Sequence, residues 1–189
     1  MLNVRIRPYQ EKDCPYVQQI CIETAGKRFV ETAHKKRAAV AAFCQYFITR
    51  CPDFCFVAVD EGDTPVGYIL CTPSFERWCR YAPEQFLSGF PFGLIWSIGS
   101  MMGAVPYLKG YPAHLHINLL PPYQRTGLGR QLMKTLEHAL RQQNCPGVSL
   151  CVGKYNQGAM RFYESCGFSV LGHHPGSVAY GKKLNGHIM

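Results

Sequence analysis

The sequence predicts a single α/β domain in which short strands alternate with amphipathic helices. Apolar residues recur with the period of a strand at the start of the chain and with the period of a helix in the segments that follow. The 189 residues are 47% hydrophobic and 17% charged, which is a globular composition and enough chain for one core. The sequence contains no internal repeat, linker or low-complexity tract. We therefore expect one domain over residues 1–189.

The first elements are a strand followed by two helices. Residues 4–7 alternate apolar and charged side chains, as a half-buried strand does. Asp13 and Pro15 are typical of a helix start, and apolar residues then recur at helical spacing. A second helical segment covers about residues 33–50.

A hairpin and a long insertion come next. Apolar segments at residues 55–59 and 66–71 flank the turn-forming residues 60–63 and predict a β-hairpin. The segment from about 72 to 112 is rich in aromatic residues, glycine and proline and follows neither period. We treat it as an insertion between two strands.

The second half of the chain returns to alternating strands and helices. Strands are predicted at residues 114–120 and 148–152, and a last strand near 178–184. A short helix is predicted over 156–167. The longer helix between the first two strands places its apolar side chains on one face, formed by Leu128, Leu132, Met133, Leu136, Ala139 and Leu140.

Charge and cysteine content limit the functional classes. A net charge of +8 suits a phosphorylated cofactor, RNA or an acidic surface. The chain has no arginine-rich tract, so we expect no nucleic-acid partner. The ten cysteines form no CxxC pair and several lie among apolar neighbours, which favours reduced thiols and argues against a metal site. The charged first residues do not form a secretory signal, and we expect a cytoplasmic protein.

One uncharged stretch, residues 85–108, is long enough to span a bilayer. It contains several glycines, prolines and serines and lies between two segments predicted to be strands of one sheet. A single crossing would place those strands on opposite sides of the membrane. We expect this stretch to form a pocket wall or an interface and not a membrane span. An interface would be compatible with a homodimer.

The turn before the long helix has the features of an anion site. We call residues 124–130 the glycine turn. A helix start leaves backbone amides unpaired and carries a partial positive charge. Gly127 and Gly129 leave room for an anion, and Arg125 and Arg130 add positive charge. The motifs of NTPase and dinucleotide loops are both absent. The alternative is that two glycines only permit a tight turn.

The residues around the glycine turn resemble a known family. Residues 119–129, Leu-Leu-Pro-Pro-Tyr-Gln-Arg-Thr-Gly-Leu-Gly, are similar to the V-x-P-x-x-Q/R-x-x-G-x-G signature of the GNAT superfamily of N-acetyltransferases. Residues 156–168, Asn-Gln-Gly-Ala-Met-Arg-Phe-Tyr-Glu-Ser-Cys-Gly-Phe, match a second signature of that family, N-x-x-A-x-x-F/L-Y-x-x-x-G-F. The resemblance implies a mixed, mostly antiparallel sheet flanked by helices and splayed at the cofactor strand. The insertion at 72–112 departs from it.

The resemblance also implies a site for acetyl-CoA as the acetyl donor. Backbone groups of Ile117, Asn118 and Leu119 would bond the pantetheine and the thioester oxygen. Asn156 would contact the pantetheine arm, and Tyr163 would protonate the leaving thiolate. The alternative for Tyr163 is a packing role. The pyrophosphate would be bound by the glycine turn: Gln124, Arg125, Thr126, Gly127, Leu128, Gly129 and Arg130.

The predicted function is transfer of an acetyl group to a primary amine of a small molecule or a peptide. The alternative is a non-catalytic module that binds or senses acetyl-CoA, because no general base is evident. His114 and His116 are one residue out of the register of the histidines in arylalkylamine acetyltransferases. Cys151 occupies a position where some relatives carry a glutamate. Residues 113–117 are also similar to the GNAT modules associated with O-GlcNAc hydrolases.

The insertion bears on the acceptor. Its aromatic density exceeds the 13% of the whole chain. An apolar pocket wall there would favour aromatic or amphipathic amines over polyamines. Packing within a long connection, or a subunit interface, is an equal alternative. The aromatic residues are Phe75, Trp78, Tyr81, Phe86, Phe90, Phe92, Trp96 and Tyr107.

Overall fold

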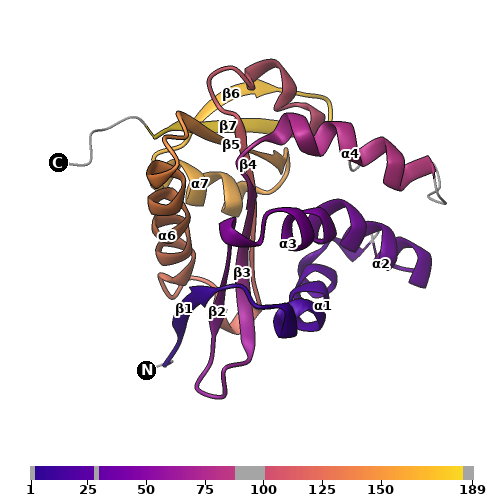
Figure 1. Cartoon of the computed structure of the whole chain (residues 1–189), viewed down its shortest axis with the longest axis vertical. Helices are drawn as coiled ribbons and strands as arrows, with labels where there is room; N and C mark the ends of the chain where they lie inside the picture. Colours follow the sequence, from indigo (N-terminus) through magenta and orange to yellow (C-terminus); the bar gives the residue numbers. More distant parts are fainter. Residues whose placement is uncertain (1–2, 28–29, 88–100, 185–189) are drawn as a thin grey trace. The chain divides into compact units, whose positions relative to one another are not determined.

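A computed structural model of the chain describes residues 3–27, 30–87 and 101–184 (Figure 1). Most of the predicted insertion is therefore described, but part of its aromatic content is not. Three of its aromatic residues lie outside the described residues: Phe90, Phe92 and Trp96.

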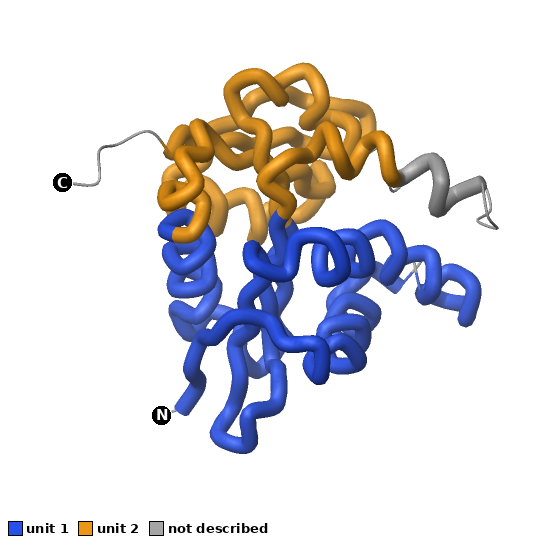
Figure 2. The backbone as a smooth tube through the Cα atoms, in the orientation of Figure 1, with its two compact units in different colours: residues 1–71, 116–138 blue, residues 72–115, 139–189 orange. Residues whose placement is uncertain are grey.

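The chain divides into two compact units (Figure 2). Unit 1 comprises residues 1–71 and 116–138, and unit 2 comprises residues 72–115 and 139–189. The described strands form a seven-stranded sheet in the order β1-β2-β3-β4-β5-β7-β6. Strand β4 (Ala113–Leu119) begins in unit 2 and ends in unit 1. Strand β4 pairs with β5 in parallel, and β1–β2, β2–β3, β5–β7 and β6–β7 are antiparallel pairs, which confirms the predicted mixed sheet.

Unit 1 is built on an antiparallel set of strands. Strand β1 (Arg5–Pro8) pairs with β2 (Cys55–Val59), which pairs with β3 (Pro65–Thr72) through the predicted hairpin. The hairpin turn contains Asp63 in a left-handed conformation, with φ of 62°. Every residue of β2 and β3 is buried, so both faces of these strands are covered. Figure 1 shows helices on either side of them.

One side of these strands is covered by a helical layer from the N-terminal part of the chain. It contains α1 (Cys14–Thr24), α2 (Ala33–Val40) and α3 (Tyr46–Arg50). The single helix predicted over residues 33–50 is interrupted by a π-helical turn, η3 (Ala41–Gln45). A π turn contains an extra residue and is often found at functional sites. Single-turn 3-10 helices flank this layer at Glu11–Asp13 and Pro52–Phe54.

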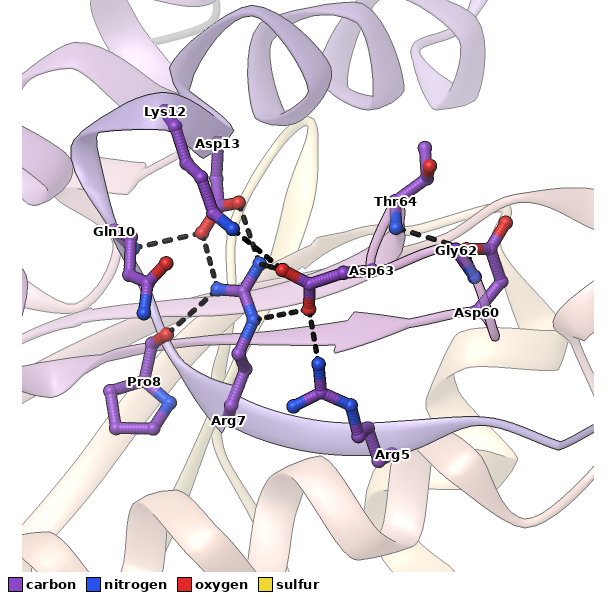
Figure 3. A network of polar contacts seen from close by, with 10 residues as sticks. All are labelled: Arg5, Arg7, Pro8, Gln10, Lys12, Asp13, Asp60, Gly62, Asp63 and Thr64. Atoms are coloured by element: carbon purple, nitrogen blue, oxygen red, sulfur yellow. Dashed lines mark hydrogen bonds and ion pairs between the residues drawn. The ribbon is translucent and has the colours of Figure 1, made fainter.

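A network of ion pairs joins β1, the start of α1 and the hairpin turn (Figure 3). The Arg7 guanidinium donates two hydrogen bonds to Asp13, at 2.7 and 2.8 Å, and their side chains are 10% and 2% exposed. Asp63 accepts hydrogen bonds from Arg5, Arg7 and Lys12 at 2.6 to 2.8 Å. These bonds, from Arg7 first and then Lys12, hold the pKa of the Asp63 carboxyl well below its usual range.

Unit 2 contains three further strands. Strand β5 (Gly147–Gly153) pairs with β7 (Ser177–Lys183), which pairs with β6 (Ser169–His173). Strand β6 was not predicted, because its first two residues are exposed and an irregularity follows Val170. The sequence around it therefore lacks a continuous period of two.

The described part of the predicted insertion contains regular structure. It contains helix α4 (Phe75–Leu87) and a 3-10 turn, Val105–Tyr107. Phe75 and Trp78 are buried and their rings stack with centroids 5.1 Å apart. These two aromatic side chains pack the core of unit 2, as the alternative interpretation of the insertion expects.

Two helices begin within the two signatures found in the sequence. Helix α6 (Leu128–Gln142) begins inside the glycine turn, and α7 (Gln157–Ser165) begins directly after Asn156. The predicted apolar face of α6 is confirmed, except that Ala139 is only half-buried. The large apolar side chains buried on this helix are Leu128, Leu132, Met133, Leu136 and Leu140.

The ten cysteines all lie in the described ranges, and none of them forms a disulfide bond. Among the described residues, no helix combines the length and the apolar character that a bilayer crossing requires. Part of the uncharged stretch at residues 85–108 lies outside the described ranges.

Candidate active site

The last part of strand β4 is the accessible part. Its first three residues are buried, whereas residues 116–119 are half-exposed. The register that pairs β4 with β5 covers Ala113 and His114, at the buried end. The backbone of residues 117–119, which the sequence predicts to bind the cofactor, therefore lies in the half-exposed part of the strand.

The glycine turn combines two residues in left-handed conformations. A 3-10 turn, Pro121–Tyr123, follows β4, and Arg125 then has a φ of 61° and Gly127 a φ of 88°. A Cβ atom at Gly127 would meet no heavy atom within 4 Å. Glycine is required here by backbone conformation and not by crowding. The space over Gly127 is open, as a site for an anion requires.

Side chains of the turn hold its shape. The Gln124 Nε2 group donates to the Leu119 carbonyl at 2.9 Å, and the Thr126 hydroxyl donates to the Tyr123 carbonyl at 2.7 Å. Both side chains are exposed. The sequence predicts Gln124 and Thr126 to bind the cofactor, and their side chains here tie the turn to itself and to the end of β4.

The backbone amides of the turn precede the first hydrogen bonds of helix α6. The Gly127 carbonyl accepts from the amides of Arg130 and Gln131, at 3.1 and 3.2 Å. The amides of residues 126–129 therefore stand at the helix start, where water or a ligand completes their hydrogen bonding. Arg125 is exposed beside them, and no carboxylate pairs with it in the described ranges.

Asn156 caps helix α7. Its Oδ1 atom accepts a hydrogen bond from the Ala159 amide at 3.1 Å, which is the usual contact of an N-cap asparagine. The cap confirms the predicted start of this helix. Contact of Asn156 with the pantetheine arm stays a prediction.

Tyr163 lies in an aromatic cluster on α7. Its ring centroid is 5.4 Å from that of Phe162 and 6.1 Å from those of Phe168 and Tyr180. The side chain is 9% exposed, and burial raises the pKa of its phenol well above the ordinary value. Tyr163 thus has the packing role considered for it, and its phenol keeps its proton near neutral pH.

His114 has a structural environment in unit 2. Its Nδ1 atom is 3.1 Å from the Ser149 hydroxyl, and its ring stacks on Phe75 with centroids 4.1 Å apart. The side chain is fully buried. Such an enclosed ring has no access to an acceptor amine.

His116 lies against the helical layer of unit 1. Its ring meets Phe43 and Phe47 edge-on, with centroids 4.9 and 5.6 Å apart. Burial lowers its pKa to about 4, so the imidazole is neutral near pH 7. Within the described residues, no three His, Cys, Asp or Glu side chains gather as a metal site would need.

Cys151 is also unsuited to act as a general base, because its thiol stays protonated near neutral pH. Its Sγ atom donates to the Met101 carbonyl at 3.5 Å, and burial raises the pKa of the thiol to about 12. It is a packed thiol, as the alternative to a catalytic role expects.

A model of the acetyltransferase (GNAT) family matches residues 17–168. The chain belongs to this family. The match includes both signatures around the glycine turn and α7.

Two proteins of known name are similar in sequence to part of this chain. The human and the mouse N-alpha-acetyltransferase 30 are each 26% identical to the chain over 124 residues, which is 66% of this chain. The chain spans about a quarter of the length of these relatives, since the match covers 26% of theirs.

Solved structures share the fold over almost the whole chain. The crystal structure of SsHAT has a TM-score of 0.83 and 27% identity, and the match covers 97% of this chain and 99% of that chain. PaiA N-acetyltransferase from Thermoplasma acidophilum, crystallised with coenzyme A, has a TM-score of 0.66 and 15% identity over 96% of this chain and 99% of that one. The latter shows likeness of fold.

The predicted site residues fall into both units. The half-exposed end of β4 and the glycine turn belong to unit 1, whereas Asn156 and Tyr163 belong to unit 2. Sequence reasoning missed a contact inside unit 1, where the Asn118 side chain donates to the Tyr68 hydroxyl at 2.8 Å. The available signal was a tyrosine within a fully apolar strand segment, because a buried phenol usually has a hydrogen-bond partner.

Proposed function

We propose that this chain transfers the acetyl group of acetyl-CoA to a primary amine of a peptide or a small molecule. The proposal goes one step beyond membership of the GNAT family. The observation that carries it is the glycine turn, with open space over Gly127 and the amides of a helix start. We also propose that the chain acts as a single domain with an insertion at 72–112. We propose a cytoplasmic location, with which ten cysteines that form no disulfide bond are consistent.

The glycine turn fits a diphosphate by its chemistry. Amides of residues 126–129 would donate to the phosphate oxygens, and Arg125 would add a charge that no carboxylate neutralises in the described ranges. The positive φ of Gly127 and the lack of a Cβ leave this face of the turn open. We assign the other members of the turn, from Gln124 to Arg130, to holding its shape and its charge.

The half-exposed end of β4 would hold the rest of the donor. Acetyl-CoA supplies the acetyl group as a thioester. Backbone groups of Ile117, Asn118 and Leu119 would bind and orient the pantetheine and the thioester carbonyl. The Leu119 carbonyl already accepts a hydrogen bond from the Gln124 side chain. The backbone N–H of Leu119 is therefore the better candidate for a contact with the donor.

Tyr163 is proposed as the proton donor to the departing thiolate. Its phenol carries a proton near neutral pH, as a general acid must. The Oδ1 atom of Asn156 caps helix α7, and its Nδ2 group is proposed to contact the pantetheine arm. Both roles rest on the family resemblance and stay proposals.

The acceptor must lose a proton before it attacks. A lysine side chain, with a pKa of about 10.4, is neutral only about once in 2,500 at pH 7, a cost of roughly 4.6 kcal/mol. An α-amino group, with a pKa of about 7.7 to 8.0, costs only about 1 kcal/mol. None of the environments of His114, His116 and Cys151 suits a strong base. An acceptor that needs little help from a base is therefore favoured.

We accordingly propose the α-amino group of a peptide as the preferred acceptor. The names of the human and mouse relatives agree with this choice. The aromatic pocket expected from the insertion has less support, because Phe75 and Trp78 pack the core of unit 2. Aromatic amines therefore rank second and polyamines last.

The alternative function is a module that binds or senses acetyl-CoA without turnover. The observation that favours it is the lack of a suitable base among His114, His116 and Cys151. It predicts tight binding of acetyl-CoA and no release of CoA with any amine.

The test is a CoA-release assay across an acceptor panel. The panel contains peptides with a free α-amine, the same peptides with a blocked α-amine and one lysine, an arylalkylamine and spermidine. We expect release with free α-amine peptides and little with blocked ones. Binding of acetyl-CoA without release from any acceptor would instead support the sensing module.

A further inference from the structure

A buried hydroxyl on strand β3 connects two layers of unit 1. Tyr68 is fully buried, and its hydroxyl accepts a hydrogen bond from Asn118 Nδ2 at 2.8 Å. The same hydroxyl lies 3.8 Å from the Sγ atom of Cys44, which is part of the π turn η3. Tyr68 therefore contacts the end of β4 on one side and the helical layer on the other.

Because the Tyr68 hydroxyl is buried, its hydrogen bonds matter for the conformation of the residues around it. A buried hydroxyl without a hydrogen bond costs free energy, so its location selects where Asn118 can lie. Burial raises the pKa of Tyr68 well above its ordinary value, so the group stays a neutral phenol that can both donate and accept. The hydroxyl is therefore available to accept the hydrogen bond from Asn118 near neutral pH.

Neighbouring residues of β3 hold the same part of β4. The Leu120 amide donates to the Val66 carbonyl at 3.0 Å. A Cβ atom at Gly67 would lie 2.2 Å from Leu119 Cδ2 and 3.0 Å from the Asn118 carbonyl oxygen. Glycine at position 67 therefore lets the backbone of β4 approach β3 closely, since a Cβ atom would crowd the Asn118 carbonyl.

The side chains of β4 on one face are fixed as a pair. His116 and Asn118 are two residues apart, so they point to the same face of the strand. His116 packs against Phe43 and Phe47, and Asn118 bonds to Tyr68. With both side chains held, the peptide groups between and after them have a defined orientation.

We infer that Tyr68 is a positioning residue, whose hydroxyl holds Asn118 so that the backbone of residues 117–119 is oriented to bind acetyl-CoA. The inference rests on the proposed function, because it assigns this backbone to the donor. Tyr68 itself is buried and acts through Asn118. The Asn118 side chain serves as an anchor, while its backbone serves the ligand.

The test compares Tyr68→Phe with Ile69→Val, a substitution at the next, equally buried residue of β3. Both variants should lose a few degrees of melting temperature. Tyr68→Phe should also weaken acetyl-CoA binding in calorimetry by about 3- to 10-fold, as expected for the loss of one buried hydrogen bond. Ile69→Val should bind like the wild type. Equal affinities of the two variants would overturn the inference, whereas a wild type that does not bind acetyl-CoA would overturn the proposed function.

A double-mutant cycle with Asn118→Ala gives a second, independent readout. Asn118 is half-exposed, so its alanine variant should fold even if Tyr68→Phe does not. Asn118→Ala should weaken acetyl-CoA binding to a similar degree. Adding Tyr68→Phe should cause little further loss, because both changes remove the same bond. Additive losses, or full affinity of Asn118→Ala, would contradict the positioning role.

Discussion

Two basic regions of unit 1 differ in what surrounds their charges. In the ion-pair network of Figure 3, the guanidinium of Arg7 is enclosed by the carboxylates of Asp13 and Asp63. In the glycine turn, Arg125 is exposed beside the amides of a helix start, and no carboxylate of the described ranges pairs with it. The charges of the first region have their partners within the protein, whereas the second is the region that we propose to bind the pyrophosphate.

We therefore expect the first region to matter for stability and the second for binding. A buried ion pair matters to folding because removal of one partner leaves a charge that nothing neutralises. An exposed cation next to free amides contributes little to folding but attracts anions. Charge count alone would have placed both regions in one class.

The largest expected effect on stability comes from Arg7→Leu. It leaves the Asp13 carboxylate, whose side chain is 2% exposed, without its partner. The free energy of unfolding should fall by about 3–5 kcal/mol in urea denaturation. Arg5→Leu is the matched control, because the Arg5 side chain is 62% exposed, and should cost about 1 kcal/mol or less. Similar losses for both variants would remove the distinction between buried and exposed members of the network.

Tyr163→Phe extends the comparison to catalysis. The phenol is buried in an aromatic cluster, so loss of the hydroxyl should leave the fold and the affinity for acetyl-CoA nearly intact. With the proton donor removed, kcat should fall by about 10²- to 10⁴-fold. Tyr155→Phe makes the same chemical change at an exposed position and should not alter kcat. An unchanged kcat in Tyr163→Phe would leave this residue with packing alone.

His116→Phe should change the pH dependence of stability. The pKa of His116 is about 4 in the folded chain and about 6.5 in the unfolded chain. Between these values only the unfolded chain binds the proton, so the wild type should lose stability as the pH falls from 6.5 to 4, by up to about 3 kcal/mol. The variant should lose less over this window in thermal denaturation at several pH values. Asp63, with its depressed pKa, contributes at lower pH. Identical pH profiles would show that His116 is not held neutral.

The smallest effect is expected for Arg125→Ala. Because Arg125 is exposed, stability should change by no more than about 0.5 kcal/mol. Affinity for acetyl-CoA should fall several-fold, and its dependence on salt should weaken. Lys134→Ala removes a charge from the exposed side of α6, away from the turn, and should leave affinity unchanged. Equal effects of the two variants would indicate a general influence of net charge.

The elements that the sequence predicted are those with a local pattern. The hairpin of β2 and β3, helix α6 and the capped helix α7 each carry their period or their cap within a few residues. Strand β6, helix α4 and the π turn η3 were missed, because an exposed irregular strand, a mixed aromatic helix and an extra residue within a helix leave no clear period. Their structure depends on contacts distant in sequence.

The same distinction holds for the candidate site. The glycine turn was predicted because its glycines, arginines and preceding strand are contiguous. The hydrogen bond between Asn118 and Tyr68 joins residues 50 positions apart, so no local sequence pattern predicts it. The pKa of His116 likewise depends on Phe43 and Phe47, which belong to another element.

The most direct test of the account is calorimetric titration of acetyl-CoA into the wild type, Gly127→Ala and Gly127→Glu. Both variants carry the same backbone strain at a φ of 88°, but only glutamate adds bulk and negative charge to the open face of the turn. We predict saturable binding by the wild type, weaker binding by Gly127→Ala and none by Gly127→Glu. Binding of acetyl-CoA by Gly127→Glu with the affinity of the wild type would contradict the assignment of the glycine turn to the pyrophosphate.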